Sequence, residues 1–186
     1  MSVDPRFPIP ALIVQRWGHR FYYGWVMTVI AATGFFFTAS GQTYTISVIL
    51  NALIEEFDVS RTAISSAYSL GTVTAAFGLP YLGSRIDRYG PRSMMVFIYG
   101  CLGLLCLLFP LAGGIGALYV FFTGLRFFGQ GAGMLVSLNL ASQWFIKRRG
   151  SAMTVAMVGG ALSSALVPPA LQMVVNLSGW RTGYLL

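Results

Sequence analysis

Five predominantly apolar stretches, each long enough to cross a lipid bilayer as a helix, follow one another along this chain. A membrane-spanning helix needs about 20 such residues. Only 9% of the residues are charged, whereas about a quarter are charged in an ordinary soluble domain. The sequence therefore predicts an all-α protein, a bundle of transmembrane helices embedded in the bilayer.

The apolar stretches set the expected helix boundaries. The five helices are predicted to run from Trp25 to about Leu53, from after Ser60 to near Leu82, from Ser93 to about Leu111, from Ile115 to Trp144 and from Ser151 to Leu177. Ser60 is expected to cap the second helix, and Pro168-Pro169 to kink the fifth. A sixth helix is expected to start after "SGWRTG" and to be cut off at Leu186. We therefore expect this chain to be the front part of a longer one.

Basic residues predict how the chain is oriented. If the five helices alternate in direction, nine basic residues fall on one side, namely Arg6, Arg16, Arg20, Arg85, Arg88, Arg92, Lys147, Arg148 and Arg149. The other side has only Arg61 and Arg181. The positive-inside rule then places the amino terminus in the cytoplasm. Because these charges form short clusters between apolar segments, and no basic face alternates with aromatic residues, no nucleic-acid partner is expected.

A dense group of charges, "GSRIDRYGPR" over residues 83–92, follows the second helix and is expected to form a short cytoplasmic loop. Gly83 would allow a close backbone approach and Gly90 a positive φ. Asp87 would pair with a neighbouring arginine or cap a helix start. From the residues alone, Arg85 would equally well be part of a positively charged loop that only sets topology, whereas the pattern as a whole argues against that alternative.

The spacing of this segment resembles motif A of the major facilitator superfamily. The matching residues of the pattern G-x-x-x-D-R-x-G-x-R are Gly83, Asp87, Arg88, Gly90 and Arg92. In that superfamily the motif is a cytoplasmic latch that stabilises the outward-open state. The resemblance therefore implies a gating role for these five residues, with Asp87 and Arg88 as the latch.

Further segments carry the same resemblance. "RFFGQGAG" at residues 126–133 resembles motif B of the superfamily. "YYGW", "FDVSRTAIS", "WFIKRRGSAM", "GGALSSALVPP" and "GWR" are similar to its branch of monocarboxylate transporters and oxalate/formate antiporters. Helix 1 departs from the eukaryotic monocarboxylate carriers because it contains no charge. The resemblance implies a cytoplasmic tail over residues 1–23 and an amino-terminal six-helix half over 24–186, with its sixth helix truncated and the carboxy-terminal half missing.

Arg126 is the single charge predicted inside a helix. Such a residue usually faces the protein interior or a water-filled path. With 3.6 residues per turn, Gln130, Gly133 and Ser137 would share its face. A similar polar stripe on helix 1 comprises Gly34, Thr38, Gln42 and Thr45.

In these transporters helices 1 and 4 flank the central cavity. The transport pathway is therefore predicted to include Arg126, Gln130, Ser137, Thr38, Gln42 and Thr45. Two alternatives to a pathway role stay open. Arg126 would have a structural role or take part in proton coupling. Gln42 and Gln130 would form hydrogen bonds between helices. Tyr68 is expected to pack between helices.

No Asp, Glu or His lies between the helix ends, and a lone buried cation favours an anionic ligand. With the branch resemblance, this predicts a secondary transporter of a small solute such as a monocarboxylate, with or without proton coupling, that works by alternating access. Its membrane would be a plasma membrane or a bacterial inner membrane. The sequence contains no nucleophile–base pair, metal cluster or phosphate loop, so no enzyme, cofactor or metal site is expected. The alternative is a half-size membrane protein that acts as a homodimer or a regulatory partner.

Overall fold

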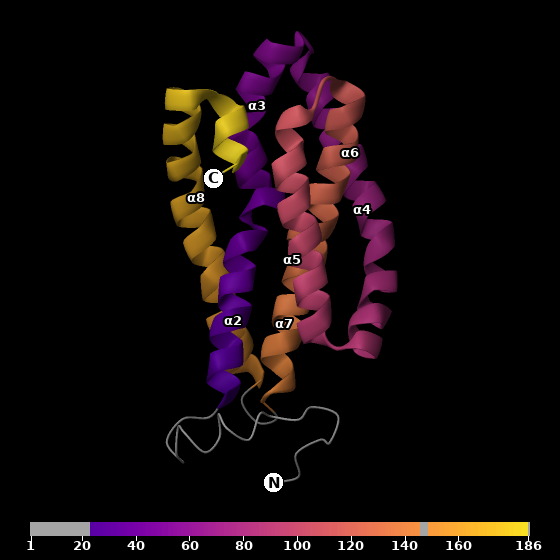
Figure 1. Ribbon diagram of the computed structural model, residues 1–186, viewed down its shortest axis with the longest axis vertical. Coiled ribbons are helices and arrows are strands. Elements are labelled where there is room, and N and C mark those ends of the chain that lie inside the picture. Colours follow the sequence, from indigo (N-terminus) through magenta and orange to yellow (C-terminus); the bar gives the residue numbers. More distant parts are fainter. Residues whose placement is uncertain (1–22, 146–148, 186) are drawn as a thin grey trace.

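A computed structural model describes residues 23–145 and 149–185, which form five long helical rods that run up and down side by side (Figure 1). The rods are α2 Tyr23–Phe37, η2 Thr38–Gly41 and α3 Thr43–Phe57; α4 Arg61–Tyr89; α5 Pro91–Leu108 and η3 Phe109–Leu111; α6 Ile115–Leu125, η4 Arg126–Gly133 and α7 Met134–Gln143; and α8 Arg149–Leu185. Each of the five predicted segments is helical, and the all-α class is confirmed.

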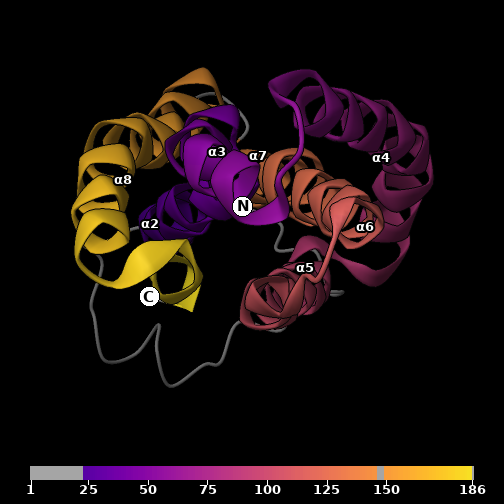
Figure 2. The same cartoon turned by 90° about the horizontal axis from the view of Figure 1, so that it is seen from above.

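The rods are arranged around two central members. Figure 2 shows α8 and α4 on opposite sides of the bundle, with the α2–α3 rod and the α6–α7 rod between them. Within the described residues, three helical stretches are long and apolar enough to cross a membrane: Tyr23–Phe57, Pro91–Leu111 and Arg149–Tyr184. Large apolar side chains cover the outer surface, such as Phe77 at 82% exposed and Leu177 at 83%. Exposed apolar faces of this extent are typical of a protein that contacts lipid or another apolar surface.

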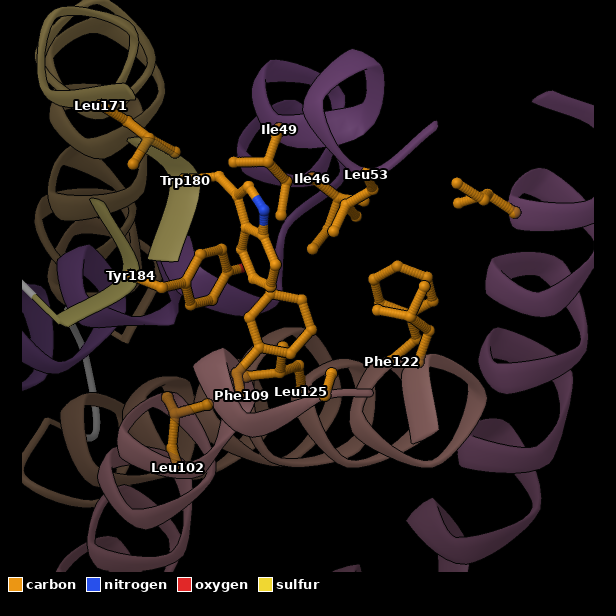
Figure 3. Packing of buried hydrophobic residues seen from close by; sticks show 13 residues of the cluster. Ile46, Ile49, Leu53, Leu102, Phe109, Phe122, Leu125, Leu171, Trp180 and Tyr184 are labelled. Atoms are coloured by element: carbon orange, nitrogen blue, oxygen red, sulfur yellow. The ribbon is translucent and has the colours of Figure 1, made fainter. Parts of the chain in front are cut away.

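The largest core cluster lies at the end of the bundle where α3 ends and α6 begins (Figure 3). Phe109 is fully buried at its centre. The ring centroid of Phe109 lies 4.5 Å from that of Tyr184, 5.5 Å from that of Trp180 and 6.1 Å from that of Phe122. Such aromatic pairs stabilise a core beyond their buried area. This cluster joins η3 and α6 to the last turns of α8.

The second helix begins as predicted and ends later than predicted. The Ser60 hydroxyl accepts a hydrogen bond from the Ala63 amide at 3.2 Å, which confirms the cap. However, α4 continues to Tyr89, so residues 83–89 are its last two turns and the expected loop is wrong. No residue before Gly90 breaks the helix. Gly90 has φ 83°, as predicted, and turns the chain directly into α5.

Two predictions for the charged segment are contradicted by this longer helix. Asp87 caps no helix start, because the N-cap of α5 is Gly90, with no side-chain hydrogen bond. A Cβ added to Gly83 would meet no atom within 4 Å, so no close backbone approach occurs there among the described residues. Asp87 also has no hydrogen bond or ion pair within residues 23–145 and 149–185.

The first and fifth helices also differ from expectation. The sequence predicts a continuous first helix, but the backbone changes to a 3-10 turn at residues 38–41 and is extended at Gln42, with φ −87° and ψ 153°. In α8 the backbone stays helical through Pro168 and Pro169, and the break lies at Gly179, with φ 81° and ψ 165°. The helix resumes at Trp180, whereas the sixth helix is predicted to start only after Gly183. The chain end turns back alongside α3 (Figure 1).

Some sequence predictions fall outside the described residues. These are the tail, Arg6, Arg16, Arg20, Lys147, Arg148 and Leu186. The described basic residues on the predicted cytoplasmic side are Arg85, Arg88, Arg92 and Arg149, which lie at the end of α4 and at the starts of α5 and α8. These element ends lie together at the lower end of Figure 1, which we call the basic end. The side of the membrane that it faces stays a prediction.

We expect Gly159→Ala to destabilise the fold, because a Cβ at this position of α8 would lie 1.9 Å from the carbonyl oxygen of Ala32 in α2. The two helices must move apart, and overpacking of this kind costs about 1–3 kcal/mol. The measurement is the midpoint of thermal unfolding in detergent. Gly100→Ala, in α5, is the matched control, because its Cβ would meet no atom within 4 Å. Equal midpoints for the two variants would contradict the close α2–α8 contact.

Candidate functional site

Two irregular helical segments cross in the middle of the bundle. The eight residues of η4, 126–133, form a π-helix, and they pack against the 3-10 turn η2. A Cβ on Gly41 would lie 2.1 Å from the Leu125 carbonyl oxygen, and a Cβ on Gly129 would lie 2.8 Å from the Gly41 Cα atom. The two backbones therefore touch, and both positions require glycine. Single π-helical turns are often found at functional sites.

The break in the first rod leaves the carbonyls of Ser40 and Gly41 without a backbone partner among the described residues, and side chains form hydrogen bonds with them instead. The Ala39 carbonyl accepts from the Gln42 amide at 2.9 Å and also from the Thr45 hydroxyl at 2.6 Å. The Ser40 carbonyl accepts from the Tyr184 hydroxyl at 2.8 Å. The next carbonyl, that of Gly41, accepts from Nη1 of Arg126 at 3.4 Å. The break is therefore fixed from three elements: α3, the end of α8, and η4.

Arg126 starts the π-helix and is surrounded by neutral polar groups. Its Nε donates to the Thr72 hydroxyl at 3.0 Å, and its Nη1 donates to the Thr43 hydroxyl at 3.3 Å. Its guanidinium carbon lies 4.9 Å from the centroid of the Tyr68 ring, in a cation–π contact. The Tyr68 and Thr43 hydroxyls are 3.0 Å apart. Arg126 thus joins the α3, α4 and η4 segments at one point.

The charge of Arg126 has no acidic partner within the part of the chain that the structure describes, and Nη2 has no hydrogen bond there. The half-buried guanidinium lies beside the first residue of α3, whose amino terminus contributes further positive potential. A cation and a helix amino terminus together favour a negatively charged ligand. The free edge of the guanidinium, at Nη2, is the group that would donate to such a ligand.

The two glutamines predicted for the pathway lie near this crossing. Gln42 is half-buried at the break, and its side-chain amide donates to the Thr38 hydroxyl at 3.4 Å. Gln130 belongs to the π-helix. Its Oε1 atom is enclosed and has no hydrogen-bond partner among the described residues. Buried polar atoms are nearly always paired, so this oxygen can accept a further hydrogen bond.

The other predicted pathway residues are buried and already bonded. The Thr38 hydroxyl donates to the Phe35 carbonyl at 2.7 Å, and Thr45 bonds the break as described above. Ser137 is fully buried and lies 2.9 Å from the Tyr99 hydroxyl of α5. Tyr99 also donates to the Gly133 carbonyl at 3.3 Å.

The predicted stripe on helix 4 assumed a regular helix of 3.6 residues per turn. The π-helix changes the register, so that Arg126 contacts α3 and α4 while Ser137 contacts α5. The side chains of Arg126 and Ser137 therefore do not lie on one face. The residues that contact Arg126 instead are Thr43, Thr72 and Tyr68, and sequence reasoning missed these contacts. The only sequence signal was that Tyr68 and Thr72 are four residues apart on one helix face.

A cavity of about 780 Å³ lies elsewhere, between α2, α5 and the last turns of α8. Its lining is mostly apolar and includes Phe37, Leu102 and Tyr184, with Thr45 among the few polar residues. Arg126 is not among its lining residues. The cavity, whose lining includes Ala39 and Ser40 of the break, is therefore a separate feature from the Arg126 site.

At the basic end, Arg92 joins three rods. Its guanidinium carbon lies 5.2 Å from the ring centroid of Trp144 and 5.8 Å from that of Tyr23, and these two rings are in edge contact at 5.2 Å. Its Nη2 also lies 3.7 Å from the sulfur of Met27. Of the five motif residues, Arg92 therefore ties α5 to α2 and to the end of α7.

The sequence profile of the Major Facilitator Superfamily matches residues 31–186, which include the helix-1 break, the π-helix and the charged end of α4. The chain belongs to the Major Facilitator Superfamily. This confirms the predicted family.

Three relatives confirm the predicted branch of this superfamily. The "Oxalate:formate antiporter" of Oxalobacter formigenes is 27% identical over 87% of this chain and 37% of its own length. "Monocarboxylate transporter 11" of Homo sapiens is 32% identical over 88% of this chain and 35% of its own length. The "Probable sulfoacetate transporter SauU" of Cupriavidus necator is 26% identical over 81% and 35%. The chain thus spans little more than a third of these relatives.

We expect Arg92→Gln to lower the midpoint of thermal unfolding, because it removes two cation–π contacts, each worth about 0.5–2 kcal/mol. Arg92→Lys should lower it less, because lysine keeps the charge but stacks less well on aromatic rings. The matched control is Arg149→Gln at the same end of the bundle, where the exposed arginine donates to one group among the described residues, the Ser142 carbonyl, at 3.3 Å. If the Arg92 and Arg149 variants unfold at the same temperature, Arg92 does not tie the rods together.

Proposed function

We propose that this chain is the amino-terminal part of a secondary transporter that moves a small organic anion, a monocarboxylate or a related carboxylate, across a membrane by alternating access. The observation that carries the proposal is the half-buried Arg126, which has no acidic partner among the described residues and an unused donor edge at Nη2. An arginine inside a membrane protein is costly unless it serves a ligand, a partner or a pathway.

The chemistry around Arg126 supports an anion as the solute. Every group that Arg126 contacts in the described part of the chain is neutral: the Thr72 and Thr43 hydroxyls, the Gly41 carbonyl and the Tyr68 ring. None of them can neutralise the guanidinium, whereas a carboxylate does so and forms strong charge-assisted hydrogen bonds with it. The names of the three relatives also refer to organic anions: oxalate and formate, monocarboxylates, and sulfoacetate.

We assign different tasks to the predicted pathway residues. Arg126 binds the carboxylate, and the amides of Gln42 and Gln130 contact the remainder of the solute. Thr38 and Thr45 position the helix-1 break, because their hydroxyls are already bonded to backbone carbonyls. Ser137 positions η4 against α5 through Tyr99. The proposal requires no cofactor.

The rest of the transport unit lies in the remainder of the protein. Transporters of this kind bind their solute near the membrane midplane between two repeats that rock against each other. A second half would therefore supply the opposite wall of the site, together with any proton-coupling carboxylate. The basic end faces the cytoplasm in this proposal, in a plasma membrane or a bacterial inner membrane, and Asp87 and Arg88 form the latch that opens as the halves rock.

The test is uptake of radiolabelled carboxylates, such as formate, oxalate and lactate, by the full-length protein in proteoliposomes. Arg126→Ala should lower uptake at least tenfold, because hydrogen bonds to a charged group contribute about 1.5–3 kcal/mol. Arg126→Lys should be intermediate, because lysine keeps the charge but loses the planar fork of donors.

Arg61→Gln is the control for this test, since Arg61 is an exposed arginine at the opposite end of the bundle from the basic end. Unchanged uptake by Arg126→Ala at equal expression would refute the assignment of the solute site. Absence of carboxylate uptake by the wild-type protein would refute the proposed substrate class.

The latch is tested separately with Asp87→Asn. We expect this variant to insert and fold normally and to transport more slowly, because Asp87 has no partner within the described half and would bond only to the other half. Ser84→Ala is the control on the same helix end, where the hydroxyl donates to the Tyr81 carbonyl of its own helix and to no other described residue. Wild-type uptake by Asp87→Asn at equal surface amount would remove the latch role.

A further inference from the structure

One face of α4 is exposed along its whole length and changes from apolar to basic at its end. Leu70 is 60% exposed, Phe77 82% and Tyr81 61%. These residues and the exposed Arg88 follow one another at intervals of seven, four and seven, so they share one helix face. The face therefore has apolar side chains in its middle, an aromatic ring below them and a cation at the basic end.

Arg85 lies beside this face and is fixed between two aromatic rings. Its guanidinium carbon is 4.7 Å from the ring centroid of Tyr81 and 5.8 Å from that of Tyr89. Its Nη2 also donates to the Tyr81 hydroxyl. The guanidinium of Arg88 lies 5.6 Å from the centroid of the Tyr89 ring. Two arginines are thus positioned by exposed tyrosines instead of by carboxylates.

The charge at this place is not neutralised by the described residues. Asp87 is adjacent in sequence to Arg88, but no ion pair joins it to either arginine within residues 23–145 and 149–185. Arg92, the next cation along the chain, makes cation–π contacts with the Tyr23 and Trp144 rings. Arg85 and Arg88 therefore leave unused donors at the boundary between an apolar face and the end of the bundle.

We propose that Arg85 and Arg88 form a binding site for the phosphate group of an anionic phospholipid, whose acyl chains lie along Leu70, Phe77 and Tyr81. The order of groups along the helix matches the order of groups in a lipid leaflet, in which tyrosines lie at headgroup level. Arginine suits phosphate because its planar donors bind two oxygens at once. A net positive site prefers a lipid with a negative headgroup over a zwitterionic one.

The inference does not depend on the proposed substrate. Arg85, Tyr81 and Tyr89 lie outside the five residues that match the motif, whereas Arg88 is one of those five and also belongs to the proposed latch. A lipid at this position would contact the end of α4 directly before the Gly90 turn into α5. Because it would be bound by a helix end, the lipid would stabilise the fold in bilayers that contain it.

The experiment is native mass spectrometry of the purified full-length protein, titrated with phosphatidylglycerol or with phosphatidylcholine of the same acyl chains. The wild-type protein should retain at least one phosphatidylglycerol at concentrations where phosphatidylcholine has dissociated. Arg85→Gln combined with Arg88→Gln should weaken this binding at least tenfold. Arg149→Gln, an exposed arginine at the same end of the bundle, should bind phosphatidylglycerol like the wild type.

A milder variant keeps the test valid if the double variant does not fold. Tyr81→Leu keeps both charges and the apolar face but removes the ring and hydroxyl that position Arg85, so its affinity for phosphatidylglycerol should be intermediate. The proposal is overturned if the wild type binds both lipids equally. It is also overturned if the double variant binds like the wild type, or if inorganic phosphate at the lipid concentration displaces the lipid.

A second measurement asks whether the face is open to lipid in the complete protein. A nitroxide label on Phe77→Cys, in a background without native cysteines, should be relaxed by oxygen dissolved in the bilayer. A label that oxygen does not reach would mean that another part of the protein covers this face, which would also overturn the proposal.

Discussion

The backbone contact between Gly41 and Gly129 is the constraint on which the other features of the site depend. At this crossing a Cβ on either residue would overlap with backbone atoms of the other rod. Only because both residues lack a side chain can the 3-10 turn of the first rod lie directly against the π-helix of the fourth. Arg126 then reaches the Gly41 carbonyl, and α3 begins within hydrogen-bond distance of Arg126.

The same crossing solves a problem that irregular backbone creates in a membrane. Unpaired carbonyls are tolerated at membrane depth only where protein or a water-filled cavity surrounds them. Here the carbonyls of Ala39, Ser40 and Gly41 accept hydrogen bonds from Thr45, Tyr184 and Arg126. Groups that would bind a solute and groups that stabilise the fold are therefore partly the same. A variant at the break should be tested for stability before its transport is interpreted.

Much of the fold could be predicted from the sequence, because long apolar stretches leave the chain few alternatives in a membrane. The Ser60 cap and the positive φ of Gly90 follow from local chemistry. The break at residues 38–42 could not be predicted, because its polar residues fit the 3.6-residue stripe of a continuous helix equally well. The π-helix shifted the register of helix 4, and the contacts of Arg126 with Thr72 and Tyr68 depend on helix packing. The charges of residues 83–89 predict a loop, but no residue there ends a helix, and α4 continues to Tyr89.

Arg126 also connects the occupancy of the proposed site with the geometry of the first rod. A ligand shifts a conformational equilibrium only by as much as its affinity differs between the two states. Nη1 of Arg126 donates to Gly41 and Thr43 on the two sides of the break, while Nη2 is unused in the described structure. In the proposed mechanism, a carboxylate bound at Nη2 would withdraw charge from those two bonds and would weaken the link between the break and η4. Because the Gly41 carbonyl is adjacent to the Ser40 carbonyl that accepts from Tyr184, such a change would reach the end of α8 through two neighbouring peptide units.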